Sequence, residues 1–134
     1  MRKAEPMDTL SFSAPSNQKP RIPRSLFRCV KDAVLGPAYG LSVAFVDSRV
    51  MRTLNQRYRG VPSATDILSF PLSKMSGEIV FSMNEVKKQA PLFGHSPTRF
   101  LAYLFIHGLL HLKGYRHGSK MEAQEQKLRR KFNI

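Results

Sequence analysis

The chain has 134 residues, 42% of them hydrophobic, a size and composition that predict one globular domain over residues 1–134. A single cysteine, Cys29, excludes an internal disulfide, and we expect it to be a small core residue. Lysine and arginine total 22 against 9 acidic residues, a formal net charge of +13. This excess predicts a polyanionic partner, with nucleic acid first, unless it serves solubility alone. No run of 18 apolar residues is present, and the start lacks the apolar core of a signal peptide, so we expect a cytoplasmic protein without membrane contact.

The first half of the chain predicts two strands that alternate with two helices. Residues 1–8 are polar and are expected to be frayed. Apolar residues then alternate with serines as in a strand, and a polar linker leads to an amphipathic helix. The expected elements are a strand at 10–14, a helix at 23–35, a strand at 41–46 and a helix at 49–58. The residues of the second helix expected to face the core are Val50, Met51, Leu54 and Tyr58.

The second half predicts two more strands followed by three helices. Pro71 closes the first of these strands, and a proline is compatible with an edge position in a sheet. Ser82 or Asn84 is expected to cap the first helix, and Ser96 followed by Pro97 is a strong start for the second. The expected elements are strands at 65–71 and 78–82, helices at 84–90, 97–112 and 119–132, and a loop at 91–96.

The helix expected over residues 97–112 carries a continuous apolar stripe, which is typical of a helix in the centre of a core. The stripe consists of Leu101, Leu104, Phe105, Gly108, Leu109 and Leu112. Strands interleaved with helices indicate an α/β or α+β fold. We therefore expect a small mixed sheet of about four strands, packed with about five helices around this central helix.

Three of the four histidines lie in the segment HGLLHLKGYRH, residues 107–117. His107 and His111 are four residues apart, so both rings project from one helix face and can reach one metal ion. Gly114 lets the chain turn after the helix, so that His117 can supply a third ligand. Three nitrogen ligands leave a fourth position for water, as in a catalytic zinc site, so we predict one Zn2+ per chain. For the pair alone, ordinary core or surface histidines would be the more common explanation, and the glycine and the third histidine are what favour a metal site. His95 is expected to be a bystander.

The spacing of these histidines also matches the zinc-binding segment of metzincin proteases, so the site is zincin-like in shape. Those enzymes place a glutamate directly after the first histidine as the general base. Gly108 stands there in this chain and has no side chain. Peptide hydrolysis by that mechanism therefore lacks its base, and a different chemistry is expected.

The segment HGLLHLKGYRH closely resembles the H-G-x-L-H-L-x-G-Y-D-H signature of the YbeY family of bacterial endoribonucleases. Two further blocks resemble that family in the same order. LNQRYRGVPSATDILSFP, residues 54–71, is similar to its N-x-x-Y/F-R…T-D-V-L-S-F-P segment, and GEIVFS, residues 77–82, is similar to its G-D-I-x-I-S strand. The resemblance covers residues 54–117.

The resemblance implies a small α/β metalloprotein that cleaves single-stranded RNA in ribosomal RNA maturation and ribosome quality control. It implies ribosomal RNA and the ribosomal subunit as partners, and it assigns the metal to His107, His111 and His117. It also assigns a functionally important arginine to Arg59, which we take as catalytic. One position departs from the family, because Arg116 stands where the signature has Asp. We expect its side chain to point to solvent or toward RNA phosphate.

Basic residues are expected to contact RNA phosphates. The group nearest Arg59 in sequence is the clearest candidate, since it contains no acid; its members are Arg49, Arg52, Arg57 and Arg59. Two further groups are Arg21, Arg24, Arg28 and Lys31, and Lys127, Arg129, Arg130 and Lys131. Tyr58, Phe70 and Tyr115 are candidates for stacking on unpaired bases, although such aromatics more often belong to the core.

The sequence leaves the general base open. Asp66 and Glu78 are candidates, and Asp66 is expected to be structural rather than catalytic. The attacking group is either water or the 2′-hydroxyl of the RNA itself. Two alternatives to an endoribonuclease are a non-catalytic RNA-binding ribosome-assembly factor with a structural metal, and a metallopeptidase. A metal site of three histidines suits Zn2+, Ni2+ or Cu2+.

Overall fold

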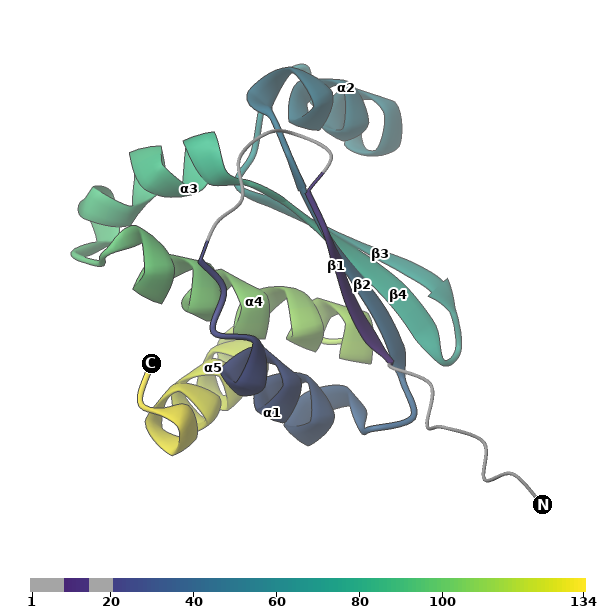
Figure 1. Cartoon of the computed structure of the whole chain (residues 1–134), viewed down its shortest axis with the longest axis vertical. Helices are drawn as coiled ribbons and strands as arrows, with labels where there is room; N and C mark the ends of the chain where they lie inside the picture. The colour runs from purple at the N-terminus through teal and green to yellow at the C-terminus, as the bar shows by residue number, and fades with distance from the viewer. Residues whose placement is uncertain (1–8, 15–20) are drawn as a thin grey trace.

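The computed structural model describes residues 9–14 and 21–134, and in these ranges it contains four strands, five α-helices and one short 3-10 helix (Figure 1). In chain order they are β1 (Leu10–Ser13), α1 (Arg24–Leu35), β2 (Gly40–Val46), α2 (Ser48–Arg59), β3 (Ile67–Ser73), β4 (Ser76–Ser82), α3 (Met83–Gln89), η1 (Ala90–Phe93), α4 (Pro97–Lys113) and α5 (Ser119–Phe132). The expected fraying of residues 1–8, and most of the linker after the first strand, lie outside the described residues. The helix η1 occupies part of the segment predicted as a loop.

The four strands form one mixed sheet in the order β1-β2-β4-β3. β1 pairs with β2 and β2 with β4 in parallel, whereas β3 pairs with β4 in antiparallel orientation. β3 is therefore an edge strand, which confirms what Pro71 indicated. The mixed sheet and the five helices confirm the predicted α+β class. None of the helices in the described ranges is long and apolar enough to cross a bilayer.

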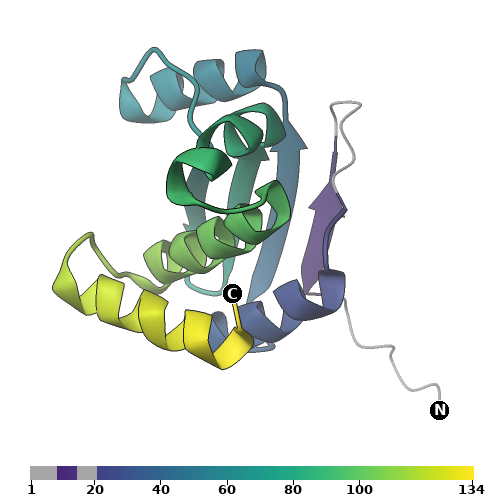
Figure 2. The ribbon, with the colours of Figure 1, turned by 90° about the vertical axis from the view of Figure 1, so that its left-hand side faces the viewer.

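The two faces of the sheet are covered by different helices (Figures 1 and 2). Along β4, Ile79 and Phe81 belong to the main core, which also contains buried residues of α1, α3 and α4. Val80, between them, points to the opposite face and packs in a smaller cluster with Met51 of α2 and Leu68 of β3. This alternation is the period of a strand buried on both faces. One sheet thus separates α4 from α2.

Two predictions about α2 were wrong. Val50 and Tyr58 were expected to face the core, yet 42% and 60% of their surfaces are exposed. Met51 is fully buried, and Leu54 is partly buried, as expected. The physical reason is that α2 packs on only part of the outer face of the sheet. Only a narrow stripe of its residues therefore contacts the sheet, and Val50 and Tyr58 lie outside that stripe.

Two predictions about α1 were also wrong. Cys29, expected in the core, is exposed, because it lies between the core-facing positions Phe27 and Val30. Lys31, expected among the polar residues that contact phosphate, is fully buried. Its ammonium donates hydrogen bonds to the Thr9 side chain and the Pro37 carbonyl, and it forms an ion pair with Asp32 at 3.2 Å. These partners satisfy a charge that would otherwise be costly to bury.

The helix α4 is the element on which the candidate site is built. Ser96 caps it by accepting a hydrogen bond from the Arg99 amide at 3.2 Å, and Pro97 occupies its first turn, as the sequence predicted. Its middle lies against β3 at Gly108. A β-carbon built there would come within 2.8 Å of Ile67 Cδ1 and 2.9 Å of Ser69 Oγ. Only glycine allows this close approach of helix and strand.

We expect Gly108→Ala to lower the free energy of unfolding by about 1–2 kcal/mol. Alanine favours the helix by about 1 kcal/mol, but overpacking a tight contact costs about 1–3 kcal/mol, and the contact to the strand outweighs the helical gain. Chemical denaturation measures the difference. Adding Ile67→Val removes the nearest methyl carbon and should recover part of the loss. A Gly108→Ala protein more stable than the parent would show that this contact is not restrictive.

Candidate metal centre

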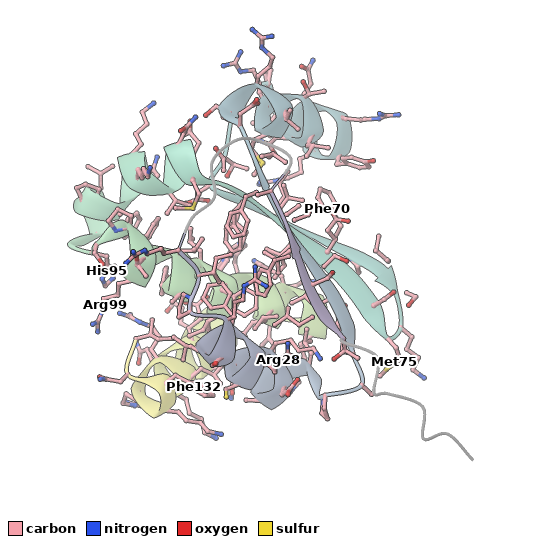
Figure 3. The ribbon with its side chains drawn as sticks, viewed as in Figure 1. Arg28, Phe70, Met75, His95, Arg99 and Phe132 are labelled. Carbon is pink, nitrogen blue, oxygen red and sulfur yellow. The ribbon has the colours of Figure 1, made fainter. Side chains whose placement is uncertain are left out.

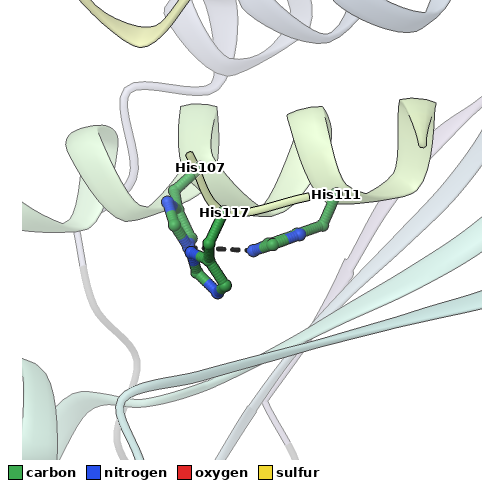
Figure 4. Close-up of side chains that lie close together, drawn as sticks. All are labelled: His107, His111 and His117. Carbon is green, nitrogen blue, oxygen red and sulfur yellow. Dashed lines mark hydrogen bonds between the residues drawn. The ribbon is translucent and has the colours of Figure 1, made fainter. Parts of the chain in front are cut away.

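Three imidazole rings converge beside the C-terminal half of α4 (Figure 4). His107 and His111 project from the same face of the helix, and His117 comes from the segment that follows it. The Nε2 atoms of His107 and His111 are 3.0 Å apart, and one ligand atom from each of the three residues lies within 4.8 Å of the others. Two nitrogen ligands of one tetrahedral zinc ion are about 3.3 Å apart. The three histidines can therefore bind a single metal ion.

The turn after α4 brings the third histidine back toward the first two. Gly114 adopts a left-handed conformation with φ of 110°, and its amide donates to the His111 carbonyl at 3.0 Å. The Tyr115 amide donates to the Leu110 carbonyl at 3.0 Å, which completes the double hydrogen bond of a Schellman-type helix end. The glycine thus has the role that the sequence predicted for it.

Two hydrogen bonds orient the rings on α4. His107 Nδ1 lies 2.5 Å from Glu125 Oε1, and His111 Nδ1 lies 3.1 Å from the Tyr115 carbonyl oxygen. A carbonyl oxygen accepts only, so His111 donates from Nδ1 and keeps the Nε2 lone pair for a metal ion. A carboxylate beside Nδ1 of His107 favours the same arrangement there. Burial lowers the pKa of His111, and the nearby His107 adds to this, so the neutral form that binds metals is favoured.

Glu125 on α5 is the site residue that sequence reasoning missed. Its side chain is buried, with 8% of its surface exposed, and its second oxygen accepts a hydrogen bond from the Tyr103 hydroxyl at 3.5 Å. The available signal was its spacing from Met121 and Leu128, which places an acid on the apolar side of a charged helix. Arg116, which stands where the family signature has Asp, is exposed, and the acid that contacts His107 is Glu125 of α5.

Glu125→Gln is expected to weaken metal binding about 10- to 100-fold, because the carboxylate that orients His107 and makes its ring more basic is lost. Titration of the metal-free protein with Zn2+ against a competing chelator measures the affinity. Glu122→Gln is the matched control, since it removes an exposed acid from the same helix. Equal affinities of the two variants would contradict the assigned role of Glu125.

The three histidines open onto a cavity of about 600 Å³ between α4, β3 and the end of α2. Its lining residues are Tyr58, Arg59, Thr65, Asp66, Ile67, Leu68, Ser69, Phe70, His107, His111 and His117. Arg59 and Asp66 thus share one hollow with the histidines. Burial raises the pKa of the Asp66 carboxyl above its ordinary value, although backbone amides and His107 act in the opposite direction.

A buried asparagine holds the loop that brings Arg59 and Asp66 to this cavity. α2 ends at Gly60 in a left-handed conformation with φ of 70°. Asn55, 2% exposed, donates from Nδ2 to the Ser63 carbonyl at 2.8 Å, and its main-chain carbonyl accepts from the Val61 amide at 3.4 Å. The loop is therefore folded back onto the last turns of α2, with Arg59 at its start and Asp66 at its end.

Other residues singled out in the sequence lie elsewhere. Arg49, Arg52 and Arg57 are exposed on α2 but do not line the cavity, and Glu78 lines a different hollow. His95 stacks at 6.3 Å on both Phe100 and Tyr103, away from the other histidines, as a bystander would.

The position next to His107 excludes the metzincin arrangement on steric grounds as well as chemical ones. A side chain at Gly108 would meet Ile67, Ser69 and Ile79 at 3.1 Å or less. The glutamate that those proteases carry at this place has no room here.

The protein-family model described as Endoribonuclease YbeY matches residues 17–133 of this sequence, and this range includes every residue that lines the cavity. The chain belongs to the YbeY family. Curated YbeY endoribonucleases are similar over most of it. The protein of Caldanaerobacter subterraneus is 40% identical over 102 residues, 63% of this chain and 65% of that relative's length. The protein of Caldicellulosiruptor saccharolyticus is 32% identical over 139 aligned positions, 85% of this chain and 86% of the relative.

A solved structure supports the same fold. The solution structure of TM1509 from Thermotoga maritima matches with a TM-score of 0.61 and 25% identity, over 92% of this chain and 88% of the other. The family match confirms the resemblance seen in the three sequence blocks.

Proposed function

We propose that this chain is a metal-dependent endoribonuclease that cleaves single-stranded RNA. Its substrate would be ribosomal RNA, in maturation and ribosome quality control on the ribosomal subunit in the cytoplasm. The observation that carries the proposal is one cavity, in a YbeY-family chain, that combines three convergent histidines with Arg59 and Asp66. A net charge of +13 favours a polyanionic substrate.

The donor set fits a divalent transition metal, and we assign Zn2+ to it first, with Ni2+ or Cu2+ as alternatives. His107, His111 and His117 would hold the ion. The Nδ1 atoms of the two helical histidines already have hydrogen-bond partners, so their Nε2 atoms, 3.0 Å apart, are the ones placed to bind an ion. When bound, such an ion supplies Lewis-acid chemistry that stabilises negative charge on a phosphate and makes water more acidic.

Residues of the chain itself would bind the phosphates and accept the proton. Arg59 would bind the scissile phosphate through its guanidinium and stabilise the charge that develops on it. The sequence favoured a structural role for Asp66, but it is the one carboxylate among the described residues that line the cavity. We therefore assign it as the proton acceptor from water or from the RNA 2′-hydroxyl. Arg49, Arg52 and Arg57, exposed on α2, would hold neighbouring phosphates.

Two alternatives receive less support. A structural metal would call for a fourth protein ligand, and among the described residues the cluster of metal-binding groups contains three histidines and no acid or cysteine. A metallopeptidase would need a base beside the first histidine, where the packing around Gly108 leaves no space. The family match favours the nuclease over both.

The proposal predicts that the purified, metal-loaded protein cleaves single-stranded RNA at internal positions. A chelator should abolish cleavage, and so should His111→Ala, which removes one of the three ligands. Gel analysis of an end-labelled RNA measures both effects, and readdition of Zn2+ after chelation is the control. Cleavage unchanged by the chelator and by His111→Ala would point to a contaminating nuclease and refute the proposal.

Substitutions of Arg59 and Arg57 should affect different kinetic constants, because of the two only Arg59 lines the cavity. We expect Arg59→Ala to lower kcat about 10²- to 10³-fold, the usual effect of removing one donor that stabilises transition-state charge. Arg57→Ala should instead raise KM a few-fold and leave kcat nearly unchanged, since it removes a phosphate contact outside the cavity. Steady-state kinetics of both variants tests this, and equal effects on kcat would contradict the assignment.

A further inference from the structure

A second hollow adjoins the histidine cavity on the outer face of the sheet. It has a volume of about 360 Å³ and is lined by Leu54, Tyr58, Phe70, Pro71, Leu72, Glu78 and Val80. Tyr58 and Phe70 line both hollows, so the two spaces meet at this aromatic pair. The ring centroids of the pair are 5.0 Å apart, with an angle of 63° between the planes. Figure 3 shows Phe70 on the side of β3 that faces α2.

The side chains of this hollow suit a flat aromatic ring. Tyr58 and Leu72 are 60% and 63% exposed, so these large side chains do not serve the core. Glu78 is the only charged residue in the lining, and within the described residues its carboxylate has no hydrogen bond or ion pair. A negative group at the wall disfavours a phosphate, whereas an aromatic rim favours stacking with a nucleobase.

The register of the sheet explains why an acid and an aromatic ring stand together. Glu78 of β4 is paired directly with Phe70 of β3, and both point to the outer face. Two consecutive residues at the end of α2 differ in which hollow they line. Tyr58 lies where the two hollows meet, whereas Arg59 lines only the histidine cavity. A nucleotide whose phosphate met Arg59 would therefore have its own or an adjacent base beside Tyr58.

We propose that this hollow binds one unpaired guanine of the RNA substrate, an inference that rests on the proposed endoribonuclease function. An ionised carboxylate only accepts hydrogen bonds, so Glu78 selects a base edge with adjacent donors. Guanine presents N1–H and the N2 amino group side by side. In adenine, cytosine and uracil an acceptor stands next to the donor on that edge. Tyr58 and Phe70 supply stacking, and Glu78 supplies selectivity.

The test uses the metal-loaded protein and fluorescent oligouridines with 2′-O-methyl sugars that carry one central guanine, adenine, cytosine, inosine or uracil. Fluorescence anisotropy measures binding, and electrophoresis after each titration verifies that the oligonucleotides are intact. We expect the guanine oligonucleotide to bind about tenfold more tightly than the uracil one, the effect of one good bidentate contact. Inosine, which lacks the N2 amino group, should lose most of this preference.

Glu78→Gln should reduce the guanine preference to about twofold or less and leave binding of the uracil oligonucleotide within about twofold of the parent. Glu122→Gln is the matched control, because it removes the same charge from α5 and should keep the full preference. Thermal unfolding verifies that each variant is folded. If Glu78→Gln does not fold, the loss of preference with inosine in the parent protein still decides the question.

Three results would overturn the inference: a parent protein that binds all five oligonucleotides equally, a preference for cytosine or adenine, or a guanine preference that persists unchanged in Glu78→Gln. Metal-dependent RNA cleavage that depends on Arg59 but shows no guanine preference would refute the base site and leave the endoribonuclease intact. Absence of both cleavage and RNA binding would refute the two proposals together.

Discussion

The candidate site depends on how closely α4 approaches the sheet, and the missing side chain at Gly108 sets that distance. Ile67 and Ser69 of β3 occupy the space that a β-carbon would need, and the Ser69 hydroxyl donates to the Gly108 carbonyl at 3.3 Å. His107 and His111 lie on either side of this contact along the helix. The packing that seats α4 on β3 therefore also fixes where their rings stand relative to the cavity wall.

The loop after α2 and the helix α5 are held to their neighbours by buried polar side chains. Asn55 fastens the loop after α2, and Glu125 fastens α5 to the ring of His107. In a chain with a net charge of +13, the acids Asp66 and Glu125 lie close to the histidines. Two of the nine acidic residues of the chain thus lie beside the candidate metal ligands, where their charge acts directly on the histidines.

The sequence predicted α4 and its histidines well because caps, apolar stripe and ligand spacing all lie within one continuous segment. It failed where the decisive partner is distant in the chain. Glu125 acquires its role only when α5 folds against α4, and Lys31 is buried because Thr9 and the Pro37 carbonyl meet its ammonium. Tyr58 was misplaced for a related reason, since helical periodicity shows which residues share a face but not how much of that face is covered.

The position of β3 at the edge of the sheet has a consequence for how a polymer meets the site. α2 lies over one face and α4 under the other, and in the described part of the chain no strand lies beyond β3. The cavity, lined by residues of α2, β3 and α4, therefore lies at the open border of the sheet. A long polynucleotide can be laid across such a border sideways, without threading a terminus, and this geometry suits cuts in the middle of a strand.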